Sequence, residues 1–131
     1  MTHTLTTSPA MVAAVDWHRV CRLADLEPGV GEAALVDGRQ VALFRLDDAV
    51  HAVGHVDPDT GAGVIARGIT GSTRVNGIDR PTVASPLHKQ VYDLTTGRCL
   101  TGGHGDGGPA LALPVHPIRV VDGWIEVSPA A

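Results

Sequence analysis

Hydrophobic positions in this chain form short clusters, and turn residues lie between them. Runs rich in Val, Leu, Ile and Ala are bounded by Asp37-Gly38, Asn76-Gly77 and Asp122-Gly123, pairs that accept the left-handed backbone of a tight hairpin. Short apolar runs between such turns predict strands. We expect strands at residues 33–36, 40–46, 50–54, 72–75, 82–85, 91–94, 118–121 and 124–127. This spacing predicts an all-β fold, an antiparallel β-sandwich or small barrel of short strands.

Few segments depart from the strand rhythm. Residues 23–26 could form at most a turn or two of helix, and segments 57–71 and 101–109 have no strand pattern. The second of these holds five glycines and is expected to be a flexible surface loop. Residues 1–14 are rich in Thr, Ser and Ala and are expected to be a flexible N-terminus. We expect residues 15–131 to form a single domain, because no linker or internal repeat divides them.

Composition narrows the class of protein. The net charge of −4 and the lack of a basic stripe argue against nucleic acid as a partner. No apolar run approaches the roughly 20 residues of a membrane span, and the N-terminus is not a convincing signal peptide. The two cysteines, Cys21 and Cys99, make no disulfide framework. These features predict a cytoplasmic protein. Aromatic residues are scarce and are expected to be core anchors; they are Trp17, Phe44, Tyr92 and Trp124.

Candidate chemistry begins at Ser85-Pro86-Leu87-His88, which is followed by Tyr92-Asp93 and a Thr96-Gly97 turn. This order resembles the second ligand box of Rieske iron–sulfur domains, Cys-Pro-x-His followed by Phe-Asp and a Thr-Gly turn. Ser85 stands at the place of the cysteine. Upstream, residues 50–59 are similar to the strand and first ligand box of the same family. There Asp57 takes the place of the cysteine and Asp59 that of the histidine.

The four corresponding positions are Asp57, Asp59, Ser85 and His88, and only His88 keeps a ligand type. A Rieske cluster needs two thiolates on one iron and two imidazoles on the other. Carboxylate and hydroxyl oxygens are hard donors, poorly matched to this iron. We therefore expect no cluster, no other cofactor and no metal in this chain. A mononuclear metal on His55 and His88 is an alternative, but two imidazoles are too few for a structural zinc site.

A narrower resemblance comes from five motifs in order: Asp57-Pro58, Arg67-Gly68-Ile69-Thr70-Gly71, Ser85-Pro86-Leu87, Lys89-Gln90 and Thr96-Gly97-Arg98-Cys99. Over residues 17–127 the chain resembles the small subunit of assimilatory NAD(P)H-dependent nitrite reductase. The resemblance implies a large catalytic subunit as partner, carrying FAD, sirohaem and an iron–sulfur cluster. That subunit performs the six-electron reduction of nitrite to ammonium. The small subunit would support it without a redox centre or catalytic residues of its own.

In a Rieske-like fold the two ligand-type loops lie together at one tip. We expect this tip to dock on the partner, and the residues expected there are Asp57, Arg67, Pro86, Lys89 and Gln90. Two other functions stay open. One is a free-standing binding or regulatory module of the same fold. The other is a Rieske [2Fe–2S] ferredoxin of a dioxygenase system, which the missing cysteines oppose.

Overall fold

The computed structural model describes residues 16–101 and 111–129. The regular secondary structure of the described chain is nearly all strand, as the turn pattern predicted, with two single-turn 3-10 helices. The elements are β1 (His18–Arg22), η1 (Leu23–Asp25), β2 (Glu32–Val36), β3 (Arg39–Leu46), β4 (Ala49–Gly54), η2 (Ile65–Arg67), β5 (Ile69–Val75), β6 (Ile78–Ala84), β7 (Val91–Asp93), β8 (Ile118–Val121) and β9 (Trp124–Val127). The predictions of a flexible N-terminus at 1–14 and of a flexible loop over most of 101–109 fall outside the described residues.

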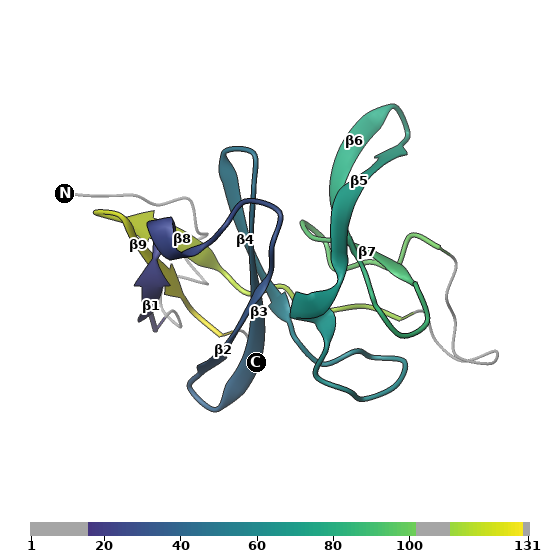
Figure 1. Ribbon diagram of the computed structural model, residues 1–131. Coiled ribbons are helices and arrows are strands. Elements are labelled where there is room, and N and C mark those ends of the chain that lie inside the picture. The colour runs from purple at the N-terminus through teal and green to yellow at the C-terminus, as the bar shows by residue number, and fades with distance from the viewer. Residues whose placement is uncertain (1–15, 102–110, 130–131) are drawn as a thin grey trace.

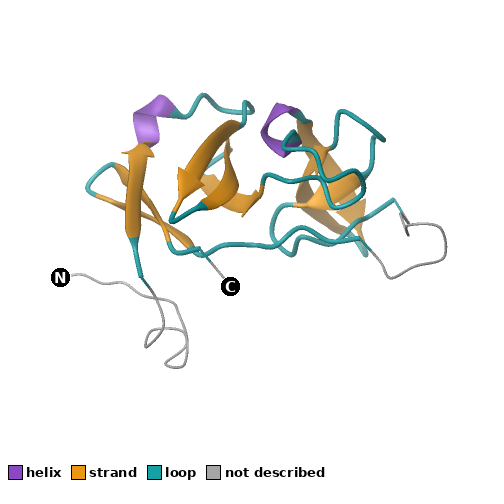
Figure 2. Ribbon diagram, turned by 90° about the horizontal axis from the view of Figure 1, so that it is seen from below, coloured by secondary structure: helices purple, strands orange, loops and turns teal. Residues whose placement is uncertain are grey.

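The strands form three antiparallel three-stranded sheets, with strand orders β1-β9-β8, β2-β3-β4 and β5-β6-β7. Figure 1 shows the sheet β2-β3-β4 in the middle, with one of the other two sheets on either side of it. Figure 2 gives the same order from a second direction. The two outer sheets therefore lie on opposite sides of the central sheet.

The predicted hairpin turns are confirmed. Asp37, Asn76 and Asp122 have φ angles of 50°, 51° and 51°, and the glycine after each also has a positive φ. Two consecutive left-handed residues match the twist of the flanking strands, which is why Asp-Gly and Asn-Gly are favoured there. These turns join β2 to β3, β5 to β6 and β8 to β9.

Strand boundaries differ from the prediction by more than one residue in three places. β1 was not expected, because its sequence is mostly polar and charged; it is held by pairing with β9. β5 begins inside segment 57–71, which was expected to lack a strand. β6 begins at Ile78 rather than at residue 82, and it includes Pro81. The Pro81 carbonyl accepts a hydrogen bond from Leu94 N, just beyond the end of β7. Pro81 thus lies just past the last paired residues of β6 and β7, Thr82 and Asp93. Its missing N–H breaks no hydrogen bond between these strands, and proline is tolerated there.

Two apolar clusters fill the interior. Phe44 and Tyr92 are fully buried in the first, together with Val53, Ile65 and Val83. The second joins β2, β3 and β4 to Ile125 and Val127 of β9; its members are Leu26, Val36, Val41, Leu43, Ala52, Ile125 and Val127. The prediction that all four aromatic residues are core anchors is wrong for two of them.

Trp17 and Trp124 are only half-buried. Side chains alternate between the two faces of a strand, and Ile125 and Val127 already occupy the core face of β9. Trp124 therefore lies on the opposite face.

Cys21 and Cys99 are both free thiols. No helix in the described part of the chain is long and apolar enough to cross a membrane.

Candidate functional site

Two loops meet beside the ends of β4 and β6. The first loop, residues 55–64, leaves β4 and leads into η2, while the second loop, residues 85–90, joins β6 to β7. We call the two loops together the tip. All four positions that resemble cluster ligands lie in these loops, and side-chain hydrogen bonds between the loops bring the four together.

The floor of the tip is the pair Asp57 and Ser85, whose side chains are both fully buried. The Ser85 hydroxyl donates a hydrogen bond of 2.5 Å to Asp57 Oδ2. The other carboxylate oxygen, Oδ1, accepts a hydrogen bond of 2.8 Å from the backbone N–H of Asp59. Burying a carboxylate is costly unless its oxygens find donors, and here each oxygen has one.

Each loop also closes on itself through the backbone. In the first loop, Asp57 N–H donates to Ala62 O at 2.8 Å and Gly61 N–H donates to Asp57 O at 2.7 Å. In the second loop, Lys89 N–H donates to Ser85 O at 3.0 Å, and Lys89 has a φ of 61°. A lysine at positive φ is uncommon and is held here by the tight return of the loop. The tip is therefore ordered by its own hydrogen bonds.

The rim of the tip is the pair Asp59 and His88. His88 Nδ1 is hydrogen-bonded to Asp59 Oδ2, and the two side chains are 61% and 20% exposed. The carboxylate of Asp59 raises the pKa of His88 above its ordinary value, first through this hydrogen bond and then through its charge. Protonated His88 is thus the form that the rim favours.

These residues do not fit a [2Fe–2S] cluster. At the four positions the donors are two carboxylates, one hydroxyl and one imidazole, whereas the cluster needs thiolates on one of its irons. The polar atoms that would have to face iron are instead bonded to one another across the loops. Among the described residues no group of three or more His, Cys, Asp or Glu side chains could hold a metal ion.

His55, the alternative metal ligand, is nearly buried and serves the backbone. Its Nδ1 accepts a hydrogen bond of 3.1 Å from Ala66 N–H. Burial lowers the pKa of His55, and the nearby charge of Arg67 acts in the same direction, while a hydrogen bond with the Gly63 backbone opposes them. A neutral His55 is the form that can accept this bond, so the side chain positions η2.

The expected docking residues separate into two groups. Asp57 is fully buried, so its carboxylate cannot reach a partner and we remove it from the set. Arg67, Pro86 and Lys89 are exposed. Neither cation forms an ion pair with another described residue. Gln90 is partly buried, and its Oε1 accepts a hydrogen bond of 3.1 Å from the Tyr92 hydroxyl.

Two residues of the tip were missed by sequence reasoning. They are Val56 and Leu87, whose side chains are 39% and 44% exposed. Leu87 carried a usable signal, because an apolar residue inside a turn has no core to reach. Together with Pro58 and Pro86 they give the tip an apolar surface beside its cations.

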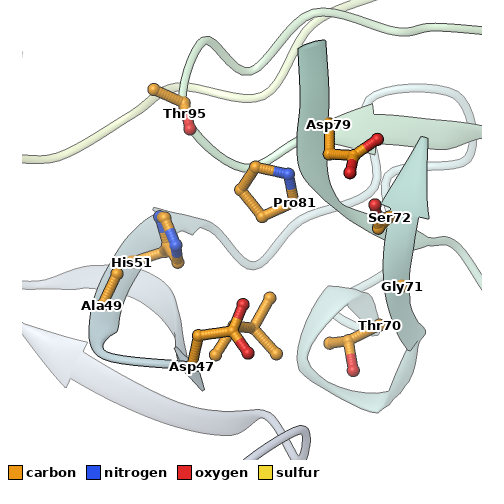
Figure 3. Close-up of a pocket in the computed structure, with 10 residues that line it drawn as sticks. Asp47, Ala49, His51, Thr70, Gly71, Ser72, Asp79, Pro81 and Thr95 are labelled. Atoms are coloured by element: carbon orange, nitrogen blue, oxygen red, sulfur yellow. The ribbon is translucent and has the colours of Figure 1, made fainter. Parts of the chain in front are cut away.

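A separate hollow lies between the β3–β4 hairpin and the β5–β6 hairpin, where it encloses about 580 Å³. Figure 3 shows His51 on one wall, Thr70 and Ser72 on the opposite wall, and Pro81 and Thr95 nearby. Burial lowers the pKa of His51, and the charge of Asp93 opposes that shift. The lining holds no tip residue and no cysteine or other strong nucleophile, so we assign it no chemistry.

Known proteins are similar to this chain over most of its described length. The family model for the Rieske-like [2Fe-2S] domain matches residues 16–128. The nitrite reductase (NADH) small subunit of Salmonella typhimurium is 38% identical over 113 residues, which span 85% of this chain and 95% of that protein. A Mycobacterium tuberculosis protein whose crystal structure is assigned as an NADH-dependent nitrite reductase small subunit is 44% identical. The structural match covers 89% of this chain and 97% of the Mycobacterium tuberculosis chain, with a TM-score of 0.76.

A third relative has a different length. The nitrite reductase [NAD(P)H] large subunit of Klebsiella oxytoca is 33% identical over 111 residues, which are 85% of this chain but only 11% of that protein. In that relative the matching region is one part of a much longer polypeptide. The curated small subunits, by contrast, match this chain over nearly their whole length. This chain therefore belongs to the Rieske-like domain family and, within it, to the small subunits of NADH-dependent nitrite reductase.

Proposed function

We propose that this chain is the accessory subunit of an NAD(P)H-dependent nitrite reductase and that it works without an iron–sulfur cluster. The observation that carries the assignment is the 38% identity over 95% of a curated small subunit. The absence of a cluster is supported by the tip, where the side chains at all four ligand positions are hydrogen-bonded to each other. The proposal takes residues 15–131 as one domain, in keeping with the family match over 16–128.

The partner in this proposal is the large catalytic subunit. It supplies the chemistry through FAD, sirohaem and an iron–sulfur cluster, and it reduces nitrite to ammonium in the cytoplasm. The Klebsiella relative supports this partner, because a region like this chain is covalently part of a large subunit there. A separate subunit must reach the same neighbourhood by docking. The free thiols Cys21 and Cys99 agree with a reducing compartment.

The tip is the surface that we propose to dock. Its hydrogen bonds hold both loops before any partner arrives, so binding need not order them and costs less entropy. Val56, Leu87 and Pro86 offer apolar contact, and Arg67 and Lys89 add positive charge at the edge. This combination fits an apolar patch bordered by acidic residues on the large subunit.

Metal analysis of the purified chain tests the claim about the cluster. We expect a colourless protein with no stoichiometric iron, including after expression with added iron and sulfide. Near-stoichiometric iron with visible charge-transfer bands would contradict the proposal and would favour the ferredoxin alternative.

Turnover measurements test the assignment of function. The chain alone should form no ammonium from nitrite and NADH, since a multi-electron reduction needs a hydride acceptor and redox centres. Mixed with its large subunit, it should bind and raise activity or stability. A free-standing binding module would instead leave the large subunit unbound and unchanged.

Substitutions at Lys89 and Arg67 test the docking surface. Reversing the charge with Lys89→Glu or Arg67→Glu should weaken affinity for the large subunit, mainly by slowing association, and should change its salt dependence. Lys89→Asn is the matched variant, because Asn removes the charge and still accepts the left-handed backbone of this position. Arg74→Glu, on β5, controls for net charge. Wild-type affinity and salt dependence in the Lys89 variants and in Arg67→Glu would move docking elsewhere.

A further inference from the structure

Both tryptophans of the chain lie on one face of the sheet β1-β9-β8, the face that points away from the core. Trp124 shares this face with Glu126, because side chains alternate along β9 and Ile125 and Val127 lie in the core. The chain has only four aromatic residues, so half of them are placed outside the core. Trp17 and Trp124 are each partly exposed, so both rings form part of the surface of this face.

Arginines cover both rings. The guanidinium carbons of Arg22 and Arg19 lie 4.6 Å and 4.9 Å from the centre of the Trp124 ring. The guanidinium of Arg119 lies 4.2 Å from the centre of the Trp17 ring. Strand register sets these contacts, because Arg22 is paired with Trp124, and Glu126 is paired with both Arg19 and Arg119. We call this surface the Arg–Trp face; its members are Trp17, Arg19, Arg22, Arg119, Trp124 and Glu126.

The face carries an excess of positive charge. Its three arginines meet one carboxylate, Glu126, which binds Arg119 at 2.7 Å and 2.8 Å and Arg19 at 3.4 Å. Arg22 has no ion pair among the described residues and is held only against the Trp124 ring. Asp25 is also close, because its Oδ2 accepts a hydrogen bond of 3.0 Å from Arg22 N–H. Three arginines less these two carboxylates leave a local charge of about +1, on a chain whose net charge is −4. A positive face on an acidic protein selects an acidic partner surface.

We propose that the Arg–Trp face is a second docking surface and that its occupant is an acidic surface of the nitrite reductase large subunit. The inference rests on the proposed function. Tryptophan and arginine dominate protein–protein hot spots, and the stacking here fixes both side chains before binding. Arg22 keeps unused hydrogen-bond donors for a carboxylate.

The position of the face fits a partner that surrounds the domain. Figures 1 and 2 place the sheet β1-β9-β8 at the opposite end from the sheet β5-β6-β7, whose strands carry the second loop of the tip. One flat surface cannot meet both ends. In the Klebsiella large subunit the matching region is 11% of the chain, so the remainder is large enough to contact both.

Binding of the wild-type chain and of Arg22→Glu to purified large subunit tests the proposal. We expect Arg22→Glu to lower affinity by about tenfold or more, as for a hot-spot arginine, and Arg22→Lys to lower it less. Arg74→Glu, which changes net charge equally at the other end, should bind as wild type. Thermal melts of the free variants check folding; Arg22 is exposed and has no buried partner to lose.

A label read directly at the face gives a second measurement. The chain grown with 5-fluorotryptophan has two ¹⁹F resonances, from Trp17 and Trp124. We expect both to shift when the large subunit is added, including with a Lys89→Glu variant at concentrations that saturate it. Resonances that only broaden, with wild-type affinity for Arg22→Glu, would overturn this surface and leave the proposed function standing.

The remaining outcomes are equally decisive. A wild-type chain that does not bind the large subunit would overturn the proposed function and this surface with it. A wild-type dimer that Arg22→Glu dissociates in sedimentation runs without the large subunit would assign the face to a second copy, and would likewise overturn the proposal.

Discussion

The floor and the rim of the tip join the same two loops but in different surroundings. The floor pair, Asp57 and Ser85, is fully buried, whereas in the rim pair His88 is 61% exposed. A hydrogen bond to a carboxylate is stronger where water is excluded, and losing it there leaves a charge without solvation. At the rim, water and salt replace a lost partner at little cost. The floor and the rim each have one side-chain bond between the loops, but loss of the floor bond should destabilise the protein more.

The two pairs also divide the former ligand positions by type. The floor joins the positions that resemble the two cysteines, and the rim joins those that resemble the two histidines. In a Rieske domain the cluster ties both halves at once. Here the floor and the rim each have their own bond between the loops, so the rim bond can break while the floor bond remains. We expect the floor to set the stability of the tip and the rim to adjust it with pH.

The largest expected effect is at the floor. Ser85→Ala removes the hydroxyl that donates to Asp57 Oδ2 and leaves a buried carboxylate oxygen unsatisfied, so the free energy of unfolding should fall by about 1.5–3 kcal/mol. Urea unfolding with unchanged m-value measures it. Ser72→Ala, the same change at an exposed position of β5, should stay within about 0.5 kcal/mol of wild type. Equal, small effects of both substitutions would show that the floor bond contributes little to stability, and the floor would then have no advantage over the rim.

A smaller loss is expected from Asp57→Asn. The amide oxygen can keep the bond from Asp59 N–H and the amide nitrogen can donate to the Ser85 hydroxyl, so a neutral bond replaces a charge-assisted one. The free energy of unfolding should fall by about 0.5–1.5 kcal/mol. In the Ser85→Ala background the same change should cost less or become favourable, because no charge is then left without its donor. Strictly additive losses would show that the two side chains do not interact.

The sequence predicted where the loops lie but not how they hold together. The hairpin turns and the four ligand positions followed from residue types at fixed offsets. The bonds between Asp57 and Ser85 and between Asp59 and His88 did not, because pairing across loops depends on register in space.

Trp124 carried a signal that was missed. In the run Trp124-Ile125-Glu126-Val127 the period of two places the tryptophan on the same face as the glutamate. Reading its size alone assigned it to the core. Pro81 led to the expectation that the strand begins at residue 82. Proline is tolerated inside β6 because β7 ends opposite it, and the sequence near Pro81 does not show where β7 ends.

The smallest expected effect is at the rim, and it depends on pH. The folded state raises the pKa of His88 above its ordinary value of 6.5. A group whose pKa is raised by folding adds stability below its unfolded pKa and loses that contribution as pH rises through its folded pKa. His88→Ala should therefore be less stable than wild type near pH 6, and the gap should close as the pH rises above 6.5 and passes the folded value. Added salt should narrow the gap at low pH, because the pair is exposed. His51, His55 and His116 titrate in the opposite sense, since burial lowers the pKa of each, so only the difference between the two proteins is informative.

Asp59→Asn is the matched variant for the rim, because it removes the charge that shifts His88 and keeps the shape of the side chain. NMR titration of the His88 imidazole should show its pKa above the ordinary value in wild type and nearer to it in Asp59→Asn. An ordinary His88 pKa in wild type, or a gap to His88→Ala that does not vary with pH, would mean that the rim pair does not form in solution. The tip would then be held by the floor alone, and the second loop would be free at His88 to adjust to the surface that it meets.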